Sequence, residues 1–158
     1  MKHFTEFKHC HLGLLLGRTA ALKDKIIDAH MEPHGLTAAQ FKVLMIMVQY
    51  GVNTPTEVGR FLSLDSGSMT RMFDRLEDKA FLIRHRSEID ARQVQLKFTE
   101  QGRQLAHRLP CIGAQAMNEL AAALSAHELK TLEYLLKKIL LAAGDPITLQ
   151  RLGLDNER

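Results

Sequence analysis

The sequence has little of what marks secreted scaffolds, membrane proteins or common enzymes. Only two of its 158 residues are cysteine and none is tryptophan, so no disulfide framework is expected. It contains no run of 18 apolar residues, and its charged N-terminal segment lacks the apolar core of a signal peptide. P-loop, dinucleotide-binding and nucleophile-elbow motifs are missing as well. We therefore expect a cytoplasmic protein that is not an enzyme, has no membrane partner and needs no cofactor.

The charge balance is mildly basic. The chain has 21 Lys and Arg against 18 Asp and Glu, a net charge of +3 and a pI of about 9.0. Residues 54–99 have a net charge of +1, because they include eight Lys and Arg and seven Asp and Glu. Such a balance is compatible with nucleic acid but does not identify it, so the placement of the charges has to carry the argument.

Residues 54–79 have the pattern of a helix-turn-helix. A short helix over 54–62 and a turn over 63–65 precede a second helix over 66–79, for which Asp65 or Ser66 is a suitable N-cap. At about 100° per residue, one side of the second helix is apolar and comprises Met69, Met72, Phe73 and Leu76. The opposite side carries Ser68, Arg71 and Arg75, residue types that bond to guanine edges and phosphates. The helix is thus predicted to enter a DNA major groove, although a surface helix with two solvated arginines has the same pattern.

Two alternating segments, 81–86 and 93–99, are predicted to form a hairpin behind this helix. Val94, Leu96 and Phe98 alternate with polar residues, as in a half-buried strand. The basic residues of the segment are Arg84, Arg86, Arg92 and Lys97, against the acidic Glu88 and Asp90. An arginine at a narrow tip suits a minor groove, and Asp90 can orient Arg92 through a bidentate pair. An ordinary charged turn is the alternative.

Helices are predicted on both sides of this unit. The first spans about 4–29, with an apolar stripe that includes His11 and Arg18 and otherwise comprises Phe4, Phe7, Leu15, Leu22, Ile26 and Ala29. Thr37, with Gln40 in a capping-box position, starts a helix over 38–49. Thr99 caps a long helix that Pro110 should kink or divide. Ser125, again with a capping box, starts the last helix, which ends at residues 144–146.

These elements predict a mainly α fold, in which a winged helix-turn-helix with a small β-hairpin wing accompanies an all-helical dimerisation lobe formed by both termini. The predicted divisions are 1–36 (N-terminal helix of the lobe), 37–99 (DNA-binding lobe), 100–143 (C-terminal dimerisation helices) and 144–158 (flexible tail). A homodimer would present two recognition helices about 34 Å apart to double-stranded DNA with a pseudo-palindromic operator. Packing of the terminal helices within one chain is the alternative.

The order of elements and three local sequences resemble the MarR family of bacterial regulators. The stretches 36–44, 70–76 and 131–138 are similar to the family's second, recognition and final helices, and Asp90-Ala91-Arg92 is similar to its wing tip. The resemblance implies a homodimeric DNA-binding protein, usually a repressor, that a small aromatic acid or cysteine oxidation releases from DNA. It assigns the wing to Arg86, Asp90 and Arg92 and the major groove to Ser66, Ser68, Thr70, Arg71 and Arg75.

Two positions depart from the family pattern. The turn after the recognition helix often has glycine, where this chain has Ala80, and a positive φ there would cost roughly 1 kcal/mol. The member that gave the family its name has a cysteine where this chain has Asp78, which excludes a thiol switch at that position.

An anionic aromatic ligand needs an apolar slot and a cationic anchor, and the sequence offers two places. The first is a cleft between lobes lined by His11, Arg18, Phe41 and Met45, where a protein carboxylate is an equally good partner for the arginine. The second, implied by the family's salicylate-type sites, comprises Pro55, Thr70, Met72 and Arg84. Arg84 can instead bind a phosphate of the DNA.

Three other functions remain open at this point. Cys10 and Cys111 lie on helices where peroxide-sensing members of the family place cysteines, so a thiol-based redox switch is one alternative. His9-Cys10-His11 suggests a metal site, but positions i and i+2 of a helix diverge by roughly 200° and cannot chelate one ion without unwinding. A metal would therefore need another combination of the eight histidines across a dimer. A winged helix used only for protein contacts is the third.

Overall fold

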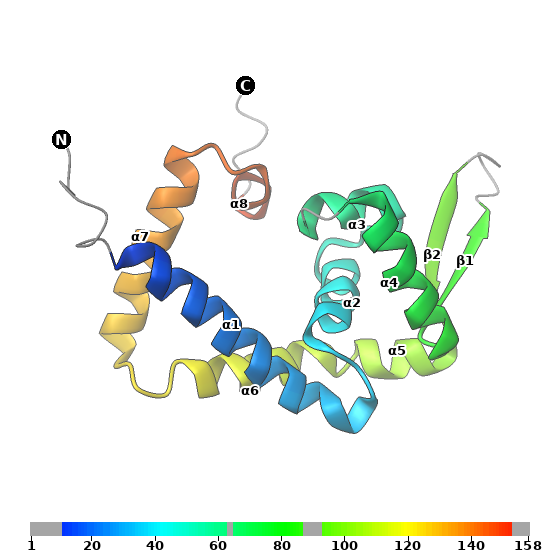
Figure 1. The fold of residues 1–158 in the computed structure, drawn as a ribbon, viewed down its shortest axis with the longest axis horizontal. Coiled ribbons are helices and arrows are strands. Elements are labelled where there is room, and N and C mark those ends of the chain that lie inside the picture. The colour runs from blue at the N-terminus through cyan, green and yellow to red at the C-terminus, as the bar shows by residue number, and fades with distance from the viewer. Residues whose placement is uncertain (1–10, 63–64, 87–92, 153–158) are drawn as a thin grey trace. The chain divides into compact units, whose positions relative to one another are not determined.

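The computed structural model describes residues 11–62, 65–86 and 93–152 (Figure 1). The chain divides into two compact units, residues 1–120 and 121–158. The first unit has the elements α1 (Leu12–Met31), η2 (Glu32–His34), α2 (Ala38–Tyr50), α3 (Pro55–Leu62), α4 (Ser66–Asp78), β1 (Leu82–Arg86), β2 (Val94–Phe98), α5 (Glu100–Ala106) and α6 (Leu109–Leu120). The second unit has α7 (Ala126–Ala142) and α8 (Pro146–Arg151).

The predicted helix starts are formed by local side-chain caps. Thr37 and Gln40 make both bonds of a capping box at α2, and Ser125 and Glu128 do so at α7. The Thr99 hydroxyl accepts the N–H of the third residue of α5. Each cap satisfies a backbone donor that the helix itself leaves unpaired, which is why these boundaries could be predicted.

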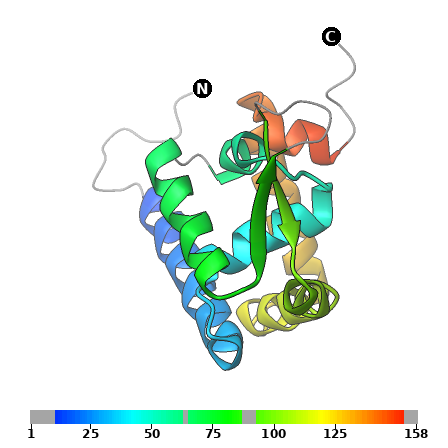
Figure 2. The ribbon, with the colours of Figure 1, turned by 90° about the vertical axis from the view of Figure 1, so that its right-hand side faces the viewer.

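The first unit is a winged helix-turn-helix. Strands β1 and β2 are antiparallel, with Leu82 opposite Phe98 and Arg86 opposite Val94. Both views show the hairpin extending beside α4, and β1 contacts that helix (Figures 1 and 2). The core joins helices and hairpin, and its most buried members are Met31, Val43, Leu44, Val58, Phe73, Leu76, Leu82, Leu96 and Leu109. The predicted mainly α fold with a hairpin wing is confirmed.

The single chain covers only part of the predicted apolar stripe of the first helix. Ile26 is buried, but Leu15 and Leu22 are 59% and 50% exposed in the single chain, and Ala29 is exposed as well. The C-terminal half of α1 also buries Ile27 and Met31, and α1 packs against α2 and α6. The predicted residues Phe4 and Phe7 lie outside the described residues.

Two features of the structure fall within the predicted C-terminal divisions. Pro110 divides the long helix, as expected, since α6 begins beside it; α5 and α6, however, belong to the first unit, so the predicted 100–143 division is split after Leu120. The flexible tail predicted over 144–158 contains α8, whose N-cap Asp145 and first-turn Pro146 are helix-start signals. The residues that stop α7 thus also start α8.

Among the described residues, we find no helix that is both long and apolar enough to cross a membrane.

Candidate nucleic-acid interface

Asp65 fixes the start of α4. Its Oδ1 accepts the Ser68 backbone N–H at 2.9 Å, and its Oδ2 accepts the Ser68 hydroxyl at 2.7 Å. These bonds, the hydroxyl first, hold the pKa of the Asp65 carboxyl below its usual value. The Thr70 hydroxyl donates to the Ser66 carbonyl at 2.9 Å. The first turn of α4 is therefore ordered before any partner arrives.

The two faces of α4 separate as the sequence predicted. Met69, Phe73 and Leu76 are at most 4% exposed and belong to the core. The predicted groove residues lie away from this core: Ser66, Thr70, Arg71 and Arg75 are exposed and Ser68 is half-buried. The Arg71 guanidinium donates to the Ser68 hydroxyl at 3.2 Å, so that two of the polar side chains form one hydrogen-bonded surface.

Arg84 of β1 is joined to α4 by two carboxylates. Its Nε donates to Glu77 at 2.8 Å, its backbone N–H donates to the other Glu77 oxygen at 2.5 Å, and its Nη2 bonds Asp74. Hydrogen bonds to Glu77 and then to Asp74 raise the pKa of Arg84, against the opposing effect of burial. Sequence reasoning missed these partners, although Asp74 and Glu77 are spaced i and i+3 and so share a helix face. The Arg84 guanidinium thus joins strand β1 of the wing to α4.

A pocket of about 400 Å³ lies between α3 and α4. It brings together Pro55 and Thr70, two of the residues predicted to hold a ligand there, with Thr56, Gly59, Arg60, Ser66 and Met69. The other two predicted residues are placed elsewhere, because Met72 packs against the core and Arg84 is held by its carboxylates. Arg60, which the sequence analysis did not select, is the cation in this pocket.

The first predicted ligand set, that of the cleft between lobes, is not brought together in the single chain. His11 and Arg18 are exposed on α1, whereas Phe41 is 6% exposed and Met45 packs against the core. The Phe41 ring approaches α6 so closely that a Cβ added at Gly113 would lie 3.2 Å from its Cζ. Phe41 is therefore a core residue, not a cleft wall.

A relative shows which family this chain belongs to. The family described as "Transcriptional regulator SarA/Rot" matches residues 25–109. The multiple antibiotic resistance protein MarR of Salmonella typhimurium is 40% identical over 132 residues, which cover 82% of this chain and 90% of that protein. The chain belongs to the MarR family. It is a winged-helix transcriptional regulator and not an enzyme.

Solved structures of DNA-binding proteins have the same fold. A variant of Escherichia coli MarR in complex with operator DNA superposes with a TM-score of 0.74 at 37% identity, covering 84% of this chain and 96% of that one. Bordetella bronchiseptica BpsR, described with regulation of its DNA binding by 6-hydroxynicotinic acid, gives a TM-score of 0.72 at 25% identity, with 86% and 96% covered.

The MarR-family wing and cysteines are described only in part. Arg86 is exposed at the end of β1, whereas Asp90 and Arg92 lie outside the described residues. Of the two cysteines, Cys111 is exposed on α6 and Cys10 lies outside the described residues. Within the described ranges, no group of three or more potential metal ligands comes together.

At the turn after α4 this chain has alanine where the family resemblance leads one to expect glycine, and the backbone there is left-handed. Ala80 has φ +57°, the only non-glycine residue with positive φ in the described part of the chain. Its N–H donates to Glu77, and the next N–H, of Phe81, donates to the Leu76 carbonyl at 3.0 Å. These bonds form a Schellman motif with alanine at the position that normally takes glycine.

Proposed function

We propose that this MarR-family regulator binds a pseudo-palindromic operator as a homodimer, with one α4 helix in each of two successive major grooves. The observation that carries the proposal is the separation of α4 into a buried apolar face and an exposed polar one. On the exposed face, Arg71 and Arg75 reach guanine edges or phosphates, and Ser66, Ser68 and Thr70 supply shorter hydrogen bonds.

The wing supplies the second contact. Arg86 is the last residue of β1. We propose that it contacts the adjacent minor groove together with Asp90 and Arg92, which lie outside the described residues, because a narrow groove attracts arginine. Because Arg84 ties β1 to α4, the wing and the recognition helix are presented to DNA as one surface.

The homodimer is supported by apolar side chains that the single chain leaves uncovered. α7 has no buried residue along its described length, and its exposed apolar side chains are Leu132, Leu135, Ile139 and Leu140. The N-terminal half of α1 exposes Leu12, Leu14, Leu15, Leu16 and Leu22. Covering each of these half-exposed side chains contributes about 1 kcal/mol, and a second copy is the partner that the family resemblance implies.

We further propose that a small aromatic acid releases the protein from its operator. The 6-hydroxynicotinic acid described for BpsR is a ligand of this class. In this chain the pocket with Pro55 and Thr70 adjoins the proposed DNA face, so that an acid bound there competes with DNA, and Arg60 can supply the positive charge. Release follows from the ligand's different affinity for the free and the DNA-bound shapes of the dimer.

The DNA-binding proposal is tested by fluorescence anisotropy with the DNA upstream of the protein's own gene. Arg71→Ala should weaken selective binding about tenfold or more, because a charged contact contributes about 1.5–3 kcal/mol. Arg151→Ala, which removes an exposed arginine from α8, should leave the affinity unchanged and is the matched control. Equal affinities for wild type and Arg71→Ala would refute the assignment of α4. Binding without salt dependence would favour a protein-contact module instead.

The proposed release by a small aromatic acid is tested on the same protein–DNA complex. Addition of salicylate should lower operator affinity in the wild type. The thiol-based switch would replace the ligand proposal if peroxide abolished operator binding, if Cys111→Ser removed this sensitivity to peroxide, and if salicylate had no effect on operator binding.

A further inference from the structure

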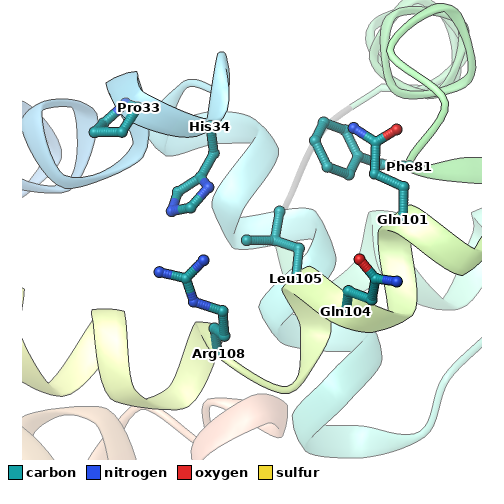
Figure 3. A pocket seen from close by; sticks show the side chains of 7 residues that line it. All are labelled: Pro33, His34, Phe81, Gln101, Gln104, Leu105 and Arg108. Carbon is teal, nitrogen blue, oxygen red and sulfur yellow. The ribbon is translucent and has the colours of Figure 1, made fainter.

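A pocket of about 420 Å³ opens between η2 and α5, on a part of the first unit that no proposed DNA or ligand contact uses (Figure 3). Its residues come from three places in the sequence: His34 from η2, Phe81 from the turn after α4, and Gln101, Gln104, Leu105 and Arg108 from α5 and the turn that follows it. The pocket shares no residue with either predicted ligand site.

The polar side of this pocket is cationic. Figure 3 shows the His34 imidazole and the Arg108 guanidinium pointing toward one another across the opening. No carboxylate is among the side chains that line it, and within the described chain the Arg108 guanidinium makes no hydrogen bond or ion pair. A guanidinium with an unused fork of donors, next to an imidazole N–H, matches a carboxylate in charge and geometry.

The opposite side of the pocket has a small apolar floor with amide neighbours. Phe81 and Leu105 are 5% and 6% exposed and present their edges to the pocket, while Gln101 and Gln104 lie along α5 beside them. The volume is within the range of small-molecule sites, where an apolar wall with a few convergent polar groups selects the ligand. A bare inorganic anion would leave this floor uncovered.

We propose that this pocket binds a small organic acid. Its carboxylate lies between Arg108 and His34, its apolar body covers Phe81 and Leu105, and the two glutamine amides bond its polar substituents.

An occupant of the pocket contacts the segment that ends the recognition helix. The Phe81 N–H is bonded to Leu76 of α4, and the Phe81 carbonyl accepts the Thr99 N–H at 3.1 Å. From the last turn of α4, Lys79 donates to the Gly35 carbonyl, next to His34, at 2.6 Å. A ligand that pulls His34 and Arg108 together therefore acts on two of the attachments of the C-terminal end of α4. This regulatory half rests on the proposed operator binding, whereas the binding half does not.

Binding is tested by titrating the full chain with salicylate and following backbone amide NMR shifts together with the heat of binding. We expect saturable shifts at Phe81 and Leu105. In Arg108→Gln the dissociation constant should rise about tenfold or more, because a charge-assisted bond to the carboxylate is lost. Gln104→Glu, which adds a carboxylate to the lining, should weaken binding to a similar degree. Arg151→Gln should bind as the wild type does.

Three results would overturn the site: no saturable shift at Phe81 and Leu105, shifts confined to the pocket of Pro55 and Thr70, or an unchanged dissociation constant in Arg108→Gln. The regulatory half is tested by operator affinity with saturating salicylate. The loss of affinity should be smaller in Arg108→Gln than in the wild type, and an equal loss in both would overturn it. A chain that binds salicylate here but no operator would refute the proposed function and leave the binding site standing.

Discussion

Replacement of Ala80 by glycine should stabilise this protein, which is unusual for a substitution that removes a side-chain atom. Ala80 has φ +57° and is exposed, so its methyl group costs backbone strain without covering the core. The backbone bonds of the turn, from the N–H groups of Ala80 and Phe81 to α4, do not depend on the side chain. Glycine keeps these bonds and adopts the same φ freely.

The magnitude is the difference between two effects of opposite sign. A non-glycine residue in the left-handed region costs about 1–2 kcal/mol in the folded state. Glycine in turn gives the unfolded chain more conformational freedom, which costs about 0.4–1 kcal/mol. The free energy of unfolding should therefore rise by about 0.5–1 kcal/mol, equivalent to an increase in Tm of about 1–4 °C for a chain of this size.

Urea denaturation followed by circular dichroism measures this change, at one fixed protein concentration because dimerisation contributes to stability. Gly35→Ala is the matched control. Gly35 has φ +65° with the same pair of backbone bonds, and a Cβ there meets nothing within 4 Å. The two substitutions should shift the midpoint in opposite directions. A neutral or destabilised Ala80→Gly, alongside a destabilised Gly35→Ala, would refute the strain argument.

Three further substitutions test the contacts around α4. Arg84→Met should lower the free energy of unfolding by about 1–2 kcal/mol, because it leaves two carboxylates of α4 adjacent and uncompensated, and a second substitution Glu77→Gln should restore part of the loss in urea titrations. The pKa of Asp65 is lowered in the folded state, so the stabilisation by its carboxylate is present above the unfolded pKa and is lost as the pH falls through the folded pKa. Asp65→Asn should therefore show a shallower decline in the urea midpoint below about pH 4 than the wild type does. An unchanged pH profile would contradict the capping role. Gly102→Ala should cost about 3 kcal/mol or more, since its Cβ would lie 2.0 Å from the Phe81 carbonyl oxygen, whereas near-normal thermal unfolding of that variant would rule out this close approach.

What could be predicted from the sequence was mostly local. The caps at Thr37 and Ser125 involve residues three apart, so the amino-acid pattern contains the whole interaction. The two faces of α4 could be predicted for the same reason, since helical geometry alone separates Phe73 from Arg71 and Arg75.

What the sequence did not predict concerns contacts between different elements. Arg84 looked like a free cation because its partners lie on the preceding helix and become neighbours only when β1 folds back along α4. The stripe of α1 was counted correctly as a periodicity, but a periodicity does not say whether its own chain covers it, and Leu15 and Leu22 are left exposed. The pocket with His34 and Arg108 joins segments more than 70 residues apart, and no sequence motif marks it.

The hydrogen bonds of Lys79 fix the C-terminal end of α4, so that α4 can tilt about this end. Its ammonium group is bonded to the Gly35 carbonyl at 2.6 Å and to Gln40, itself 2% exposed, at 3.0 Å. The 13 residues of α4 extend roughly 20 Å from this anchor, so a tilt of about 10° moves the opposite end by about 3 Å. This displacement is close to the spacing of successive bases along a DNA strand, about 3.4 Å. A tilt of this size about the Lys79 anchor thus shifts Ser66 and its neighbours by about one base step.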